Sequence, residues 1–240
     1  MNLTGVTHAF GLALFLWMGS SSTIEAAGNT PISPSSEFGL SDEQRRSLEE
    51  KASKGDAESA LRIAFFYEFV RRDDDKARLK WYRRAEELGS GVGALYLAHH
   101  YRNIAQPPDF KTAFEVYQKW AKRGNSDAMI AVGEMLEEGQ GIPKDRADAM
   151  KWYEKAARAG KVFTMEKLSS KLLEDGNVFE AYIWAEVGFL RRKRVGPEKI
   201  KQRDPAELAK KLTSEQLGQA KKNAAKLDKE IPFIEPWTSW

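Results

Sequence analysis

The feature that most constrains the fold is a set of three similar segments that begin 35 and 36 residues apart. In each segment a bulky residue is followed by tyrosine, then by alanine and a closing glycine. Repeats of this length are typical of paired helices stacked in a row, because one pair can bury its apolar face only against its neighbours. We therefore predict an all-α, right-handed helix-turn-helix solenoid. The segments are WYRRAEELG (81–89), VYQKWAKRG (116–124) and WYEKAARAG (152–160).

A second pattern precedes each segment and marks the first helix of each pair. A bulky residue is followed by a small one, which should let the two helices of a unit approach closely. A degenerate fourth copy extends the pattern, so we predict about four units over residues 55–190. The bulky-small pairs are Ile63-Ala64, Leu97-Ala98, Val132-Gly133 and Leu168-Ser169.

Tryptophan and glycine positions predict how the units pack and end. We expect the large side chains of Trp81, Trp152 and Trp184 to fill the space between consecutive units. A glycine closes each second helix, where the backbone needs a positive φ. These glycines are Gly89, Gly124 and Gly160.

The third unit carries the fullest form of the motif: Ala128, Val132-Gly133, Gly139-Gln140-Gly141-Ile142, Asp145, Ala149, Trp152-Tyr153, Ala156-Ala157 and Gly160. This order resembles the Sel1-like repeat, a relative of the tetratricopeptide repeat. The resemblance covers about residues 55–190 and implies an exported bacterial Sel1-like protein that binds other proteins. Units one and two lack the G-x-G loop, so the loop between their helices should be shorter.

Helix-capping residues precede the repeats. Ser41 and Gln44 have the spacing of a capping box, in which each side chain satisfies a free backbone N–H group. This pattern predicts an N-terminal capping helix over residues 41–54. Residues 28–40, which are rich in Pro, Ser, Gly and Thr, are interpreted as a flexible leader.

The segment 191–240 is predicted to hold C-terminal capping helices and an apolar tail. Asp204-Pro205 has the order of an N-cap acid and a first-turn proline, and Thr213 begins a second capping box. The basic run Arg191–Arg194 is interpreted as a solvated segment that follows a helix.

The first 27 residues are interpreted as a signal peptide. The apolar run from Ala9 to Met18 is too short to cross a membrane as a helix but suits the core of such a peptide. An uncleaved N-terminal anchor is the alternative, because no Lys or Arg precedes the run. Either reading predicts an exported protein in the periplasm, with membrane contact only through an uncleaved N-terminal segment.

No arrangement of residues indicates catalysis, a metal site or a cofactor. The chain has no cysteine, which excludes disulfides and thiolate ligands. His99 and His100 are adjacent, so in an α-helix they point about 100° apart and cannot bind one metal ion together. The net charge of +3 comes from mixed charges, which argues against a nucleic-acid partner. We expect a protein without enzymatic activity.

The resemblance implies that the first helix of each pair lines a concave groove that binds a protein partner. Counting from the bulky-small pairs gives an apolar and aromatic end followed by an acidic end. Phe233, Trp237 and Trp240 of the tail are further candidate contacts. The expected groove residues are Leu61, Phe65, Glu68, Phe69, Leu95, His99, Arg102, Asn103, Ile130, Glu134, Glu137 and Glu138.

Alternatives stay open for part of this surface. Phe65 and Phe69 can instead pack against the helix over 41–54, and the acidic residues of unit three can be simple solvated charge.

The family resemblance suggests two kinds of partner. The first is a toxin: exported relatives include immunity proteins that occlude type VI secretion effectors, notably phospholipase-type ones, encoded nearby. The second is an envelope protein or a sensor kinase, with this chain as a periplasmic adaptor or regulator. A cell-wall hydrolase or β-lactam-binding enzyme is a third reading, which no residue pattern supports.

Overall fold

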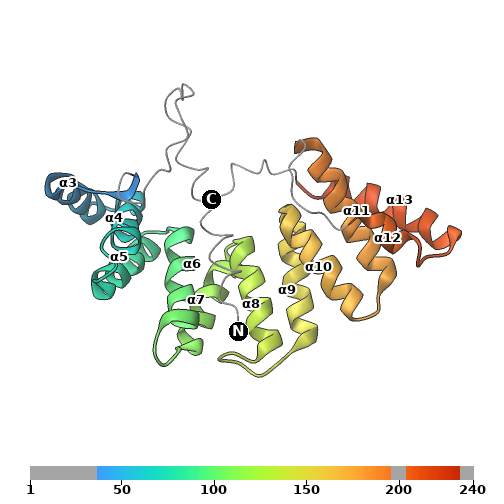
Figure 1. Ribbon diagram of the computed structural model, residues 1–240, viewed down its shortest axis with the longest axis horizontal. Helices are drawn as coiled ribbons and strands as arrows, with labels where there is room; N and C mark the ends of the chain where they lie inside the picture. The colour runs from blue at the N-terminus through green and yellow to red at the C-terminus, as the bar shows by residue number, and fades with distance from the viewer. Residues whose placement is uncertain (1–36, 196–203, 233–240) are drawn as a thin grey trace.

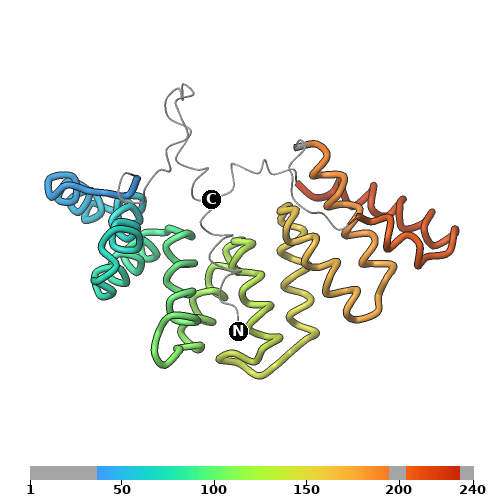
Figure 2. Tube along the Cα trace, in the orientation of Figure 1, coloured from blue at the N-terminus to red at the C-terminus, as the bar shows by residue number. Residues whose placement is uncertain are grey.

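The computed structural model describes residues 37–195 and 204–232, and all regular elements in this part of the chain are helices. Consecutive helices pack against each other and form an arc of helix pairs (Figures 1 and 2). This confirms the prediction of an all-α repeat solenoid. The four pairs are α4 (Ala57–Phe69) with α5 (Asp75–Glu87), α6 (Gly91–His99) and η2 (His100–Ile104) with α7 (Phe110–Lys122), α8 (Ser126–Glu138) with α9 (Arg146–Arg158), and α10 (Val162–Glu174) with α11 (Val178–Val195).

A polar residue starts the second helix in each of the first three pairs. The side chain of Asp74 accepts a hydrogen bond from the backbone N–H of Ala77 at 2.9 Å, and Asp145 caps α9 in the same way. Asp109 caps α7. Such caps satisfy helix N–H groups that have no partner within the helix. The recurring aspartate therefore sets where each second helix begins.

A close contact between the two helices of a pair explains why a small residue follows the bulky one on the first helix. Gly133 on α8 lies against the ring of Tyr153 on α9, where an added Cβ atom would come within 2.5 Å of the tyrosine Cε1 atom. Tyr153 and its counterpart Tyr82 are each only 1% exposed. The predicted close approach is therefore confirmed for unit three, and tyrosine is the side chain that fills it.

All three tryptophans named from the sequence pack against the core, but to different extents. Trp184 is buried, but Trp81 and Trp152 are partly exposed, while the tyrosine after each of these two is buried. In a helix the two neighbouring positions point about 100° apart, so only one of them can face the partner helix. The glycine prediction is confirmed, since Gly89, Gly124 and Gly160 have φ values of 99°, 95° and 99°.

The N-terminal capping helix is confirmed as α3 (Asp42–Ser53), with the capping box of Ser41 and Gln44 present in full. It packs on α4. Phe38, which we assigned to the flexible leader, is buried and lies against the rings of Phe65 and Phe69. The end of that segment is thus part of the folded body, and residues 1–36 lie outside the described part.

The C-terminal caps are confirmed as α12 (Pro205–Ala209) and α13 (Ser214–Glu230), each with the expected N-cap residue. The reading of the basic run was wrong for Arg191. This residue lies within α11 and is 1% exposed, because α13 packs on α11 and brings Asp228 within 2.9 Å of its Nε atom. Arg194 also pairs with Asp228.

We expect Gly133→Ala to lower the free energy of unfolding by about 1–3 kcal/mol, because the new methyl group must displace the buried Tyr153 ring. Gly218→Ala is the matched control. Gly218 lies inside α13 with no atom near its Cβ position, so alanine should stabilise by about 0.5–1 kcal/mol. Urea unfolding followed by circular dichroism measures both, and an unchanged midpoint for Gly133→Ala would contradict the packing argument.

Candidate protein-binding surface on the first helices

The apolar residues expected in the groove are part of the core. Leu61, Phe65, Leu95 and Ile130 are all buried, and Phe65 is 2% exposed. The Phe65 ring lies 5.9 Å from the ring of Phe38 and 5.3 Å from that of Tyr96, measured between centroids. These four residues are therefore not accessible to a partner, which corrects the expected apolar end of the groove.

Phe69 keeps part of its surface accessible. Its ring stacks on Phe38 with 4.6 Å between centroids. The internal packing that we left open for Phe65 and Phe69 is thus found, but the contact comes from Phe38, which precedes the helix over 41–54. Phe38, which lies outside the repeats, therefore covers the first helix of unit one.

Arg102 on η2 connects the second unit to the third. It donates hydrogen bonds to Glu134 at 2.9 Å, to Glu138 at 3.2 Å and to Gln140 at 2.7 Å, and its side chain is 12% exposed. Three acceptors around one guanidinium fix its position, since the planar group offers donors in set directions. Arg102 is therefore held in place before any partner binds.

The same connection continues from α8 to α10. Glu134 also accepts a hydrogen bond from Lys167, and Glu137 pairs with Lys171 at 3.2 Å and with Arg146. Each carboxylate expected in the acidic end thus has a cation beside it. The interpretation of this region as an acidic end is corrected, because its charge is neutralised by side chains of the neighbouring helices.

Glu134 shows the electrostatic effect of this pairing. Burial by itself raises the pKa of a carboxyl group, but the positive charges of Lys167 and Arg102 outweigh it and hold the pKa of Glu134 below its usual value of 4.5. Glu134 therefore carries its negative charge at neutral pH.

We name the set Arg102, Glu134, Glu137, Glu138, Lys167 and Lys171 the charge ladder.

The two adjacent histidines point to different partners, as the sequence predicts. The Nδ1 atom of His99 lies 3.0 Å from Asn103, and that of His100 lies 3.3 Å from Arg78. Burial lowers the pKa of both histidines, and the nearby Arg102 and Arg78 lower them further. Both rings are therefore neutral at pH 7.

Sequence reasoning missed the lysines of the ladder, Lys167 and Lys171, and the neighbouring Arg146. A signal was present, because Arg102 and Glu134 are 32 residues apart and Glu134 and Lys167 are 33 apart, close to one repeat. Opposite charges at this separation on successive first helices indicate a cross-unit pair. Glu68 belongs to another group, and it contacts Arg78 and Tyr82 of its own unit.

The described part of the chain, residues 37–195 and 204–232, contains neither a candidate metal site nor a candidate membrane span. In these ranges no group of three or more His, Cys, Asp or Glu side chains is placed to hold a metal ion, and no helix is both long and apolar enough to span a bilayer. The candidate tail residues Phe233, Trp237 and Trp240 lie outside the described residues, so their role stays a prediction.

The stacked helix pairs and the row of fixed polar side chains define a helical-repeat protein, the class that typically serves as a protein-binding scaffold. The family model of the Sel1 repeat matches residues 57–90, 92–125 and 126–161. Residues 57–161 therefore contain three Sel1 repeats. The fourth helix pair, α10 with α11, and the terminal helices lie outside the matched residues.

Several curated proteins are similar to part of the chain. It is 32% identical over 127 residues to a chitin synthase regulator of Saccharomyces cerevisiae, a stretch that covers 50% of this chain and 18% of that protein. It is 31% identical over 85 residues to an ERAD-associated E3 ubiquitin-protein ligase component of Arabidopsis thaliana, covering 35% and 14%. The chain thus spans less than a fifth of these relatives.

A solved structure extends the similarity of the fold to most of the chain. It is a protective antigen of uropathogenic Escherichia coli strains, described as displaying an SLR fold. The TM-score is 0.65 with 20% sequence identity, and the match covers 95% of this chain and 46% of that one. At this identity the similarity applies to the fold alone.

We expect Glu134→Gln to lower the free energy of unfolding by about 1 kcal/mol at pH 7, because the amide removes the counter-charge of Lys167 and one of the two counter-charges of Arg102. A carboxyl whose pKa is lowered by folding stabilises above pH 4.5 and loses this effect as pH falls through its folded pKa. The difference between the variant and the wild type should therefore shrink in acid.

Urea midpoints measured from pH 7 down to pH 3 test this. Glu50→Gln is the control, because Glu50 pairs with Lys54 while both side chains are largely exposed, and it should change the midpoint little. A Glu134→Gln penalty that stays constant over the whole range would show that the charge is not its cause.

Proposed function

We propose that this protein binds a protein partner across the charge ladder and performs no catalysis of its own. The observation that supports this most is that Arg102, Glu134 and Lys167 join three successive first helices through direct hydrogen bonds. Side chains held in one geometry lose little conformational freedom when a partner arrives, so less of the binding energy is lost to ordering. No cofactor is required by this mode of action.

The accessible surface beside the ladder suits recognition of a polar protein surface. Asn103 and Glu138 are exposed, and His99 is partly exposed. A rim of hydrogen-bonding groups around ordered charges favours orientation and specificity more than raw affinity. The partner that fits is a folded protein with alternating charges.

We propose as the partner a toxin that acts in the periplasm, with this chain as its immunity protein. The support is the resemblance to exported Sel1-like proteins that block phospholipase-type effectors of type VI secretion, together with the signal-peptide pattern of residues 1–27. Binding would act by occlusion, in which the solenoid covers the active site or substrate entrance of the toxin.

A periplasmic adaptor or regulator is the second candidate, and the names of the relatives favour it. The similar proteins include a chitin synthase regulator and a component of an E3 ubiquitin-protein ligase, which are regulatory or assembly roles in those proteins. In this reading the same surface holds an envelope protein or a sensor kinase.

We expect Glu138→Lys to weaken partner binding at least about tenfold, because it reverses an exposed charge beside Arg102. Glu115→Lys is the matched control, since Glu115 is exposed on the second helix α7 and makes the same change of charge away from the ladder. Calorimetry with the purified product of the adjacent reading frame measures both dissociation constants.

The outcome separates the candidates. Tight binding that also blocks the partner's toxicity on coexpression, and that only Glu138→Lys weakens, would support toxin neutralisation through the ladder. Binding to a partner without toxicity would favour the adaptor. Equal loss in both variants would reject the ladder as the binding surface, and no binding at all would reject the neighbouring gene product as partner.

A further inference from the structure

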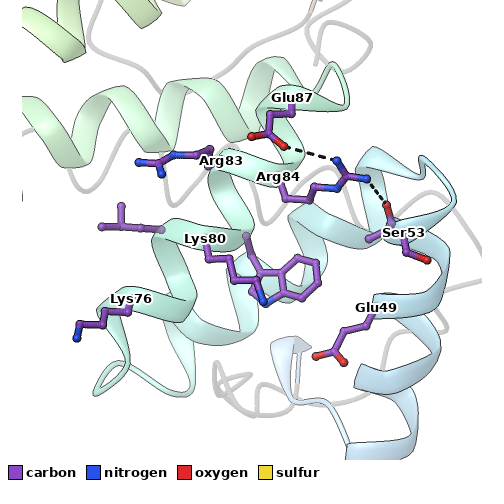
Figure 3. A pocket seen from close by; sticks show the side chains of 10 residues that line it. Glu49, Ser53, Lys76, Lys80, Arg83, Arg84 and Glu87 are labelled. Carbon is purple, nitrogen blue, oxygen red and sulfur yellow. Dashed lines mark hydrogen bonds and ion pairs between the residues drawn. The ribbon is translucent and has the colours of Figure 1, made fainter.

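A second surface lies away from the charge ladder, between the capping helix α3 and the second helix of unit one, α5. It is a cleft of about 660 Å³. In Figure 3, Lys76, Lys80 and Arg83 lie along α5, and Arg84 reaches across toward α3. The apolar side chains of Trp81 and Leu79, both partly exposed, contribute to the lining. The cleft therefore combines an aromatic side chain with several cations.

The two carboxylates that line the cleft are already neutralised. Glu49 pairs with Arg45 at 3.1 Å, on its own helix. Glu87 pairs with Arg84 at 3.5 Å, while Arg84 also donates a hydrogen bond to the backbone carbonyl of Ala52. The Arg84 side chain therefore joins α5 to α3 at one end of the cleft, and both carboxylates of the cleft already have a cation beside them.

Three cations remain without a counter-ion. Among the described residues, Lys76, Lys80 and Arg83 form no ion pair with a carboxylate. Lys80 lies 5.3 Å above the Trp81 ring, and Arg83 donates a hydrogen bond to the hydroxyl of Tyr101 at 2.6 Å. The Trp81 ring and the Tyr101 hydroxyl thus position Lys80 and Arg83 but carry no negative charge. The charged side chains that line the cleft, four cations and two carboxylates, therefore have a net charge of +2 beside an aromatic ring.

The charge balance of the cleft differs from that of the surface on the first helices. In the charge ladder every carboxylate has a cation within the molecule, so that surface is close to neutral. In the cleft the positive charge is unmatched, and a ligand must supply the negative charge. Exposed cations around a partly exposed tryptophan are the composition of a protein-binding hot spot, which is enriched in tryptophan and arginine.

We propose that this cleft binds an acidic protein segment in which a bulky apolar residue is flanked by carboxylates. The apolar residue would pack on Trp81 and Leu79, and the carboxylates would pair with Lys76, Lys80 and Arg83. A nucleic acid fits less well, because its phosphates need an extended basic stripe and the chain as a whole carries only +3. This site is separate from the ladder and does not rest on the partner proposed there.

Fluorescence anisotropy with the full chain tests the site. The probe is a labelled acidic peptide of sequence DEDLFEDE, and its matched controls are the neutral NQNLFQNQ and the acidic DEDGGEDE. We expect DEDLFEDE to bind with a dissociation constant of about 10–100 μM at low salt, and the two controls to bind at least about tenfold more weakly.

The variant Lys76→Glu/Lys80→Glu should lose at least about tenfold in affinity, since both lysines are exposed on α5 and their reversal adds four negative charge units. Lys221→Glu/Lys222→Glu makes the same change on the exposed side of α13 and should bind as the wild type does. Unfolding midpoints of both variants show whether each chain is folded.

Three results would overturn the proposal. The first is no binding of DEDLFEDE at millimolar concentration, and the second is equal loss of affinity in the two double variants. The third is tighter binding of a single-stranded oligothymidylate than of the peptide, which would make the cleft a polyanion site. Because the ladder residues are untouched, binding of a partner at the first helices is scored separately in the same variants.

Discussion

The contact between a small residue on the first helix and a buried tyrosine on the second is the constraint on which the rest of the solenoid depends. Gly133 leaves room for the ring of Tyr153, and this sets how closely α8 and α9 pack. The hydroxyl group of Tyr153 donates a hydrogen bond to the carboxylate of Glu137 at 2.7 Å. Unit one repeats the arrangement with Tyr82 and Glu68 at 3.3 Å. The core contact thus positions a carboxylate at the surface.

The solenoid has two surfaces that differ in charge, one close to neutral and one positive. On the first helices, charges of one unit are cancelled by charges of the next, which stiffens the row and leaves little net field. Between α3 and α5 the carboxylates pair with arginines of the same protein, whereas Lys76, Lys80 and Arg83 have no carboxylate partner among the described residues. A partner at the first surface is selected by hydrogen-bond geometry, whereas a partner at the second is selected by charge.

The fold was largely predictable because its determinants are local and repeated. The bulky-small pairs, the closing glycines and the capping boxes each act within one unit or one helix end, so a single sequence contains the whole signal. The structure confirms the close approach at Gly133 and the caps at Ser41 and Thr213.

The candidate surface was less predictable because it depends on contacts between units and beyond them. The sequence places Phe65 on the correct helix, but its burial depends on Tyr96 of the next unit and on Phe38, which lies in a segment without any repeat pattern. Likewise, the acidity expected at Glu134 and Glu137 disappears only when the lysines of α10 are brought alongside. Periodicity indicates which helix a residue belongs to, and it does not indicate which neighbour covers or pairs with it.

The buried pair of Arg191 and Asp228 has a consequence for the order in which the chain acquires its structure during synthesis. Arg191 donates hydrogen bonds to Asp228 and to the backbone carbonyls of Ile231 and Pro232, all of which are made about forty residues later. A guanidinium sealed from water without these acceptors costs several kcal/mol. The last turns of α11 therefore reach their final packing only after α13 has been synthesised and has docked on α11.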